Sequence, residues 1–460
     1  MEKVSFMGAT GIGGFLARFG ALFCLVAVSA VILPAQSVED RIAALETRIR
    51  QLEQELVASK GGVREIHAAD GDGARPFIRP AVLVSSSPSP VLVPAEVAEP
   101  AAPAPPQQAP ATADIASSPE WEGLSFFKGV RFGGFLESYY GYNFNKPGDR
   151  HIAYRNFDFN HNSLTLSQVS FDVSKPVSES SPLGYMLQLG FGPTADLVNS
   201  GDFAIGNSTA AHFFQYYLSG RVPVGRGLTL DVGKFVTQHG AEVIDSRADW
   251  NLSRSLLFAW AIPYYHFGLR ATYPASDKVT LGAFLVNGWN NVLDNNGGKT
   301  GGFQLIWNPS SRFSFVQNYM VGPEQADDND NSRHLLDSLI TIKLHDKVTF
   351  MTNFDYGLDR LTSGESVHWI GTAGYLRLAP TNWFALIPRF EFYNDPQGFT
   401  TGARQQLKEI TITPEFLIGE HLVTRFEYRR DWSNADTFSR GPEESGRSQD
   451  TAAVGLILKF

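Results

Sequence analysis

The sequence contains almost no cysteine, with a single residue, Cys24, in 460 positions. Cys24 lies in an N-terminal segment that we expect to be removed on export. The remaining chain would then have no disulfide, no thiolate nucleophile and no cysteine-based metal site. Long apolar runs are also missing, because no stretch after residue 35 approaches the roughly 18 uncharged apolar residues of a spanning helix. We therefore expect no helical membrane span beyond the N-terminus.

Charge is also sparse, at 18% of residues, and the net charge of −9 argues against nucleic acid as a partner. The segment 8–14 is glycine-rich like a dinucleotide-binding loop, but no strand precedes it and it lies in the N-terminal segment. The sequence has no zinc-protease histidine motif, nucleophile elbow or phosphate loop. We predict no catalytic residue, no metal and no cofactor, and we do not expect an enzyme.

Residues 1–35 have the pattern of a secretory signal peptide. Lys3 and Arg18 precede an apolar run at 19–33, and residues 34–36 offer a cleavage point. The alternative is a membrane anchor, but the run is shorter than the roughly 20 apolar residues that a spanning helix needs. We therefore expect an exported protein.

Residues 36–60 are predicted to form a short coiled-coil helix. Apolar residues recur at spacings of four and three and form one seam: Val38, Ile42, Leu45, Ile49, Leu52 and Leu56. The segments 41–46 and 48–53 both run from Arg to Glu and place possible ion pairs beside this seam. This pattern looks like a trimer-favouring motif, whereas Ile at a with Leu at d favours two strands.

Residues 61–120 are rich in Pro, Ala, Val and Ser. Such a segment buries too little apolar surface to fold, so we predict an extended or disordered linker that acts as a spacer.

From residue 121 to residue 460 the sequence predicts an all-β, antiparallel transmembrane barrel. Runs of alternating apolar residues are separated by turn-forming residues, which is the pattern of membrane strands. We predict sixteen strands, with eighteen as the alternative. Their cores begin near Val130, Ser163, Gly184, Phe213, Leu228, Tyr264, Lys278, Thr300, Phe313, Arg333, Val348, Val367, Trp383, Lys408, Leu422 and Asp450.

The connections alternate between short turns and long loops, as in an outer-membrane barrel with its short turns in the periplasm. An even strand count places both barrel ends on the short-turn side. The coiled coil and linker would then lie in the periplasm.

The strand faces differ in chemistry. In the strand from Leu422, residues such as Phe426 and Tyr428 alternate with Arg425, Glu427 and Arg429, which suits lipid on one face and water on the other. A soluble β-sandwich would alternate too. The ending at Phe460, with apolar residues at alternate positions before it, is similar to the C-terminal signal that the barrel-insertion machinery reads and favours the membrane barrel.

Two prolines conflict with this pattern. Pro388 and Pro414 interrupt adjacent predicted strands, and each removes a backbone donor from the sheet. We expect a bulge or a weakened seam between strands thirteen and fourteen.

Residues 130–460 resemble the β-barrel porins of the OmpL-like type. The segment 132–145 (FGGFLESYYGYNFN) is similar to that family's first strand, and 231–235 (DVGKF) and Phe460 are similar to later elements. The resemblance implies a water-filled pore in the bacterial outer membrane, leaves the solute open, and favours a homotrimer for the coiled coil.

The third long loop, 236–263, contains the apolar segment 256–262, which is unsuited to free exposure in water. We expect it to fold into the barrel and narrow it, as the third loop does in the porins that the chain resembles. The alternative is that it covers the rim or a neighbouring subunit. Charges of both signs would face each other across water and give weak ion selectivity. The residues expected at this constriction are Glu242, Asp245, Arg247, Asp249, Arg254, Arg389, Glu391, Arg425, Glu427 and Arg429.

These observations favour passive diffusion of ions and small hydrophilic solutes. The alternative is a structural anchor that tethers the envelope through its N-terminal coiled coil and contacts peptidoglycan. An acyl-hydrolase barrel would need a Ser and His pair at the rim, and nothing in the sequence indicates one. The expected surroundings are outer-membrane lipid and lipopolysaccharide.

Overall fold

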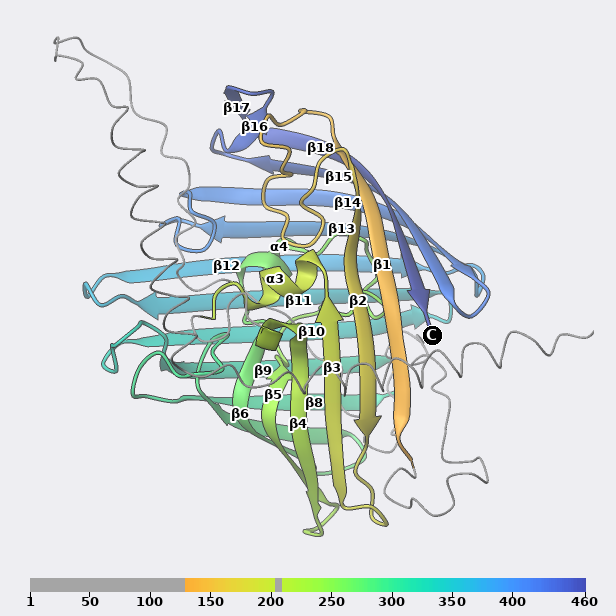
Figure 1. Cartoon of the computed structure of the whole chain (residues 1–460), viewed down its shortest axis with the longest axis vertical. Coiled ribbons are helices and arrows are strands. Elements are labelled where there is room, and N and C mark those ends of the chain that lie inside the picture. The colour runs from red at the N-terminus through yellow and green to blue at the C-terminus, as the bar shows by residue number, and fades with distance from the viewer. Residues whose placement is uncertain (1–128, 203–208) are drawn as a thin grey trace, which may run out of the picture. The chain divides into compact units, whose positions relative to one another are not determined.

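The computed structural model describes residues 129–202 and 209–460. These residues form an all-β closed barrel of sixteen antiparallel strands, in which each strand pairs with its neighbours in the chain (Figure 1). The predicted signal, coiled coil and linker lie outside the described residues, including the seam Val38, Ile42, Leu45, Ile49, Leu52 and Leu56.

The strands begin within three residues of their predicted positions, and the largest difference is at β14, which begins at Gln405. No helix of the described residues is long and apolar enough to cross a membrane. The elements are β1 (Arg131–Asn143), β2 (Ser163–Lys175), β3 (Leu183–Phe191), α3 (Pro193–Asn199), η4 (Thr209–His212), β4 (Phe213–Val222), β5 (Leu228–Val236), α4 (Leu256–Trp260), β6 (Tyr265–Pro274), β7 (Val279–Val286), β8 (Thr300–Ser310), β9 (Phe313–Pro323), β10 (Ser332–His345), β11 (Val348–Arg360), β12 (Ser366–Leu378), β13 (Phe384–Asp395), β14 (Gln405–Ile418), β15 (Leu422–Ser433), β16 (Phe438–Arg440), β17 (Glu444–Gly446) and β18 (Ser448–Lys459).

Two of these strands do not belong to the barrel wall. β16 and β17 pair only with each other and form a small hairpin in the last long loop. The wall therefore consists of β1 to β15 and β18, and the predicted count of sixteen is confirmed over the alternative of eighteen.

The seam between the first and last strands closes the barrel. β1 pairs with β18 from Phe135 opposite Lys459 to Asn143 opposite Thr451. Beyond this ladder, Gly134 N donates to Phe460 O at 3.0 Å and Phe460 N donates back to Gly134 O at 3.1 Å. The Phe460 ring lies half exposed on the outer wall, with its centroid 5.8 Å from that of Phe171.

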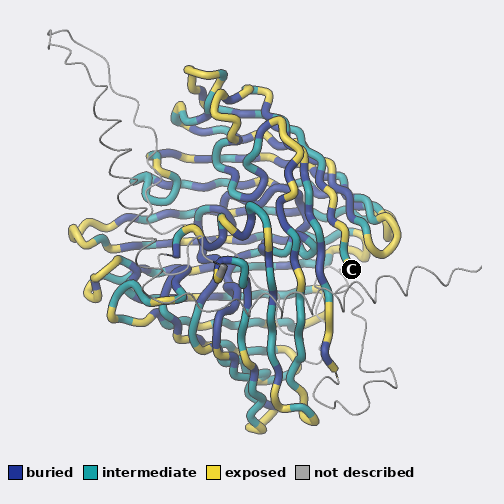
Figure 2. Tube along the Cα trace, in the orientation of Figure 1, coloured by how far each residue is buried: buried dark blue, intermediate teal, exposed yellow. Residues whose placement is uncertain are grey.

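The two faces of the wall have the predicted chemistry, and buried and exposed positions alternate along the strands (Figure 2). On β15, Phe426 and Tyr428 are exposed on the outer face, whereas Arg425, Glu427 and Arg429 are buried on the inner face. This is the reverse of a soluble sandwich, because the charged face is the enclosed one.

The prediction about the two prolines is wrong in its location. The ladder between β13 and β14 is continuous, with Leu386 opposite Pro414 and Pro388 opposite Ile412. The gaps occur on the other side of each proline, in the β12–β13 ladder beside Pro388 and in the β14–β15 ladder beside Pro414. A proline lacks one donor, so it interrupts only the ladder toward which that donor would point.

Candidate functional site

The connection between β5 and β6, residues 237–264 and hereafter loop 3, lies against inward-facing side chains of the barrel. Its only regular element is α4, where the Ser255 side chain caps the first turn by accepting from Phe258 N at 3.0 Å. Leu256, Leu257 and Phe258 are buried. This short helix is stabilised by packing, since five residues alone would not hold a helix in water.

Two aromatic residues of the wall bind the C-terminal end of α4. Trp369 Nε1 on β12 donates to Ala261 O at 3.0 Å, and the Tyr393 hydroxyl on β13 donates to Trp260 O at 3.0 Å. These bonds satisfy carbonyls that a helix end leaves unpaired. The apolar segment of loop 3 is thus packed inside the barrel.

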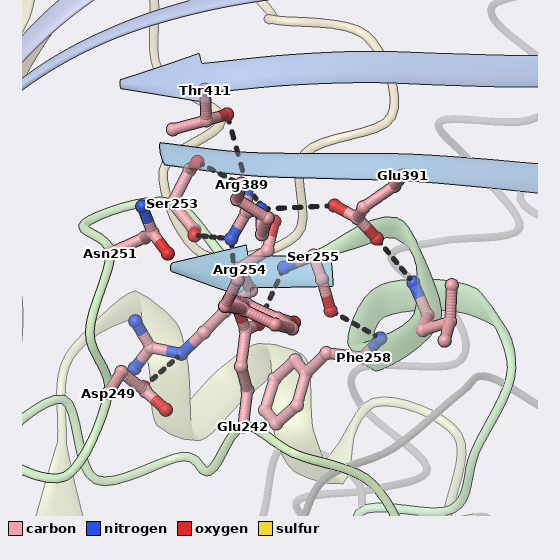
Figure 3. A network of polar contacts seen from close by, with 12 residues as sticks. Glu242, Asp249, Asn251, Ser253, Arg254, Ser255, Phe258, Arg389, Glu391 and Thr411 are labelled. Atoms are coloured by element: carbon pink, nitrogen blue, oxygen red, sulfur yellow. Dashed lines mark hydrogen bonds and ion pairs between the residues drawn. The ribbon is translucent and has the colours of Figure 1, made fainter. Parts of the chain in front are cut away.

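Charged wall residues hold the rest of the loop, as Figure 3 shows for Arg389 and Glu391. Arg389 Nη1 donates to Glu242 Oε1 at 2.8 Å and to Ser253 O at 2.7 Å. Glu391 Oε2 accepts from Leu256 N at 2.7 Å. A carboxylate at the start of α4 is favourable because it satisfies a free backbone donor.

The neighbouring strand β15 continues this pattern. Glu427 accepts from Leu252 N at 2.8 Å and from Ser253 N at 3.1 Å. Arg425 donates to the carbonyls of Ser246, Asp249 and Asn251. Arg429 Nη1 donates to Arg254 O at 2.8 Å. Every inward charge that was predicted on these strands therefore contacts loop 3.

Two acidic residues of β14 complete the network and were not among the predicted site residues. Glu409 lies 2.9 Å from Arg389 Nε, and Glu415 lies 2.8 Å from Arg425 Nε. Both carboxylates are fully buried. The alternation of the strand after Gln405 carried this signal, because every second residue through Glu415 faces the interior.

Inside loop 3, a second ion pair joins Asp249 and Arg254, with Oδ2 and Nε 2.9 Å apart. Arg254 also donates to Val243 O and Ile244 O at 2.9 Å, so it closes the loop on itself. Burial raises the pKa of Asp249, and the neighbouring Arg254 guanidinium opposes this shift.

This arrangement differs from the expectation that loop and wall charges would face each other across water. Glu242, Asp249 and Arg254 are buried, and they bond to the wall or to loop 3 itself. An unpaired charge away from water is costly, so close pairing is the stable arrangement once the loop is packed.

Asp245 and Arg247 lie apart from this network and retain contact with solvent. Arg247 Nη2 lies 2.6 Å from Asp172 on β2 and 2.5 Å from Asp245. Side-chain exposures are 11% for Arg247, 16% for Asp172 and 20% for Asp245. Of the charged loop 3 residues that were predicted, only Asp245 and Arg247 can meet a solute in this conformation.

No group of three or more His, Cys, Asp or Glu residues that could hold a metal ion is found in residues 129–202 and 209–460.

The sequence matches the model of one protein family, described as "Putative beta-barrel porin-2, OmpL-like", over residues 129–460. No curated protein gives a significant match. Among solved structures, the anion-selective porin of Comamonas acidovorans is similar, with 9% identity, a TM-score of 0.50 and coverage of 72% of this chain and 99% of that chain. The outer-membrane channel DcaP of Acinetobacter baumannii is 12% identical, with a TM-score of 0.48 and coverage of 72% and 96%. At 9% identity, the likeness to the Comamonas acidovorans porin shows the fold alone.

Proposed function

The chain belongs to the OmpL-like β-barrel porin family of the outer membrane, and on this premise we propose that it lets ions and small hydrophilic solutes diffuse through a pore that loop 3 narrows. The observation that carries the proposal is the bonding of loop 3 to the inner wall. Three wall arginines and two wall glutamates, Arg389, Arg425, Arg429, Glu391 and Glu427, contact it directly. A sixteen-stranded barrel would otherwise leave a wide aqueous channel.

The charges that select ions in this proposal are the solvent-accessible ones. Arg247 lies between Asp172 and Asp245, so this cluster carries one net negative charge. A single net charge beside a water column gives weak preference for cations, and mixed signs favour hydrated polar solutes over apolar ones.

The test is deletion of residues 247–260 followed by single-channel recording in planar lipid bilayers. We expect a clear rise in conductance with altered ion preference, because the deletion removes α4 and the arginines of loop 3. A matched control deletes residues 362–364, which are exposed in the connection between β11 and β12. Unchanged conductance in a correctly folded deletion variant would place loop 3 outside the conducting path.

Assembly as a homotrimer is part of the proposal. Three leucines on neighbouring strands, Leu164, Leu183 and Leu218, are 70–77% exposed on the outer wall, where either lipid or another subunit can cover them. The predicted coiled coil at 36–60 would add to this contact. Deletion of 36–60 should weaken the assembly in mild detergent without abolishing it, and a monomeric full-length protein would refute the trimer.

Lipopolysaccharide is the proposed lipid partner at the outer rim of β13 to β15. Lys408 and Arg430 lie on the outer face where the apolar band gives way to the loops, beside Phe392 and Trp432. Arg430 is paired with Asp450 at 2.8 Å, so Lys408 is the residue that we expect to bind a lipid phosphate. Lys408→Gln should lower the amount of lipopolysaccharide that copurifies, whereas Lys347→Gln, in a short turn at the opposite end, should not.

A further inference from the structure

The first long loop, residues 144–162 and hereafter loop 1, folds back on itself rather than extending from the rim. Ile152 N donates to Phe159 O at 2.7 Å, His161 N donates to Arg150 O at 2.8 Å, and the rings of His151 and Phe159 stack. Its tip, residues 153–158, is half-buried or buried.

The tip of loop 1 contacts α4 of loop 3 directly. Asn156 Nδ2 donates to Ala259 O at 2.9 Å and to the Tyr264 hydroxyl at 3.1 Å. The Phe157 ring packs against Phe258, with centroids 5.3 Å apart, and against Tyr264 at 5.7 Å. Loop 1 therefore contacts α4 and Tyr264 next to Trp260 and Ala261, which the wall binds.

Loop 1 is itself fixed to the barrel wall. Arg155 Nη1 lies 2.6 Å from Asp158, and Arg155 Nη2 lies 3.5 Å from Asp431 on β15 and donates to Thr451 on β18 at 2.8 Å. Gln449 Nε2 on β18 donates to Ala153 O at 2.8 Å. The contact between loops 1 and 3 is therefore anchored at both ends.

The backbone of loop 1 shows that this conformation is imposed by its surroundings. Tyr154 has φ +59°, in the left-handed region that costs a bulky residue energy. Its ring packs edge-on against Trp260 and Phe438, and its carbonyl accepts from Trp260 Nε1 at 3.4 Å. Such strain persists only where packing overcomes it.

We propose that loop 1 is a second pore-determining element, which holds loop 3 against the wall and sets the width of the channel together with it. The inference rests on the proposed function, since it assigns a role in conduction. It assigns this role to Asn156 and Phe157, whose side chains contact loop 3. Both are positioning residues because they act through α4.

The experiment compares Asn156→Ala and Phe157→Ala with Phe159→Ala in single-channel recordings and in solute uptake by proteoliposomes. Phe159 is a matched control in the same loop, and its ring stacks on His151 rather than on loop 3. Asn156→Ala removes two hydrogen bonds, so the time spent in a wider conducting state should rise about tenfold. Phe157→Ala should act in the same direction, and Phe159→Ala should match the unaltered protein.

A second variant separates loop release from misfolding. Asn156→Cys combined with Ala259→Cys joins the two loops when a short thiol cross-linker is added, because the described residues contain no cysteine. Cross-linking should hold the narrow state and abolish wide openings. Normal conductance in Asn156→Ala and Phe157→Ala would overturn the inference while leaving the pore intact. A folded barrel that does not conduct at all would instead defeat the proposed function.

Discussion

Glu427 provides the most direct test of how loop 3 is held. Its carboxylate accepts from Leu252 N at 2.8 Å, from Ser253 N at 3.1 Å and from the Thr413 hydroxyl at 2.8 Å. Glu427→Gln keeps the size of the side chain but removes its charge. It also replaces one accepting oxygen with an NH2 group, which cannot accept from Leu252 N or Ser253 N. Hydrogen bonds to a buried charged group contribute about 1.5–3 kcal/mol each, so loss of the backbone pair should weaken loop docking by about 3 kcal/mol.

The assay is hydrogen exchange of the loop 3 amides in the refolded barrel. Because each 1.4 kcal/mol corresponds to a factor of about ten, protection at residues 252 and 253 should fall by about two orders of magnitude. The wall strands should keep their protection, since their ladders do not depend on Glu427. Glu444→Gln, an exposed carboxylate in β17, is the matched control. Unchanged protection of loop 3 in a folded Glu427→Gln protein would refute the reasoning.

Three further variants test separate parts of the account. Arg247→Gln removes the cation between Asp172 and Asp245, so reversal potentials in a salt gradient should show a stronger preference for cations. A stronger preference for anions would show that this cluster does not select the ions. Burial raises the pKa of Glu324 from 4.5 to about 7, so the stability that its protonated form contributes is lost as pH rises from about 4.5 to about 7. Glu324→Gln should flatten the change in thermal stability over this range, and an unaltered profile would contradict this. Gly302→Ala would place a Cβ 1.9 Å from the Phe284 ring and should lower the free energy of unfolding in denaturant by about 1–3 kcal/mol. Gly220→Ala meets open space and should leave it unchanged, and equal stability of the two variants would refute the packing argument.

The barrel itself could be predicted because its information is local. Residues such as Arg425, Phe426 and Glu427 alternate in chemistry along one strand, and a period of two fixes which face each occupies. Turn residues then mark the ends, so strand number and strand starts follow without knowledge of distant contacts. The direction of the proline gaps could not be predicted, since it depends on which neighbour each missing donor would face.

The interior was less predictable because it depends on contacts between distant segments. The apolar character of 256–262 indicated packing, but not that Trp369 and Tyr393 would bind its end. Charge alone could not show that Glu242 pairs directly with Arg389, since their separation is set by how deeply the loop enters. Glu409 was missed because its place in the alternation of the strand is that of any inward-facing residue, and its pairing with Arg389 leaves no local signal. The contact of Asn156 with Ala259 was missed because loop 1 has no distinctive sequence.

The central claim, that this barrel is an open conduit for small hydrophilic solutes, is tested most directly by single-channel recording of the refolded full-length protein in planar lipid bilayers. The account predicts discrete conductance steps that grow in proportion to salt concentration, as expected for diffusion through a water-filled pore. A correctly folded barrel that inserts and gives no steps would contradict it, and would favour the structural anchor instead.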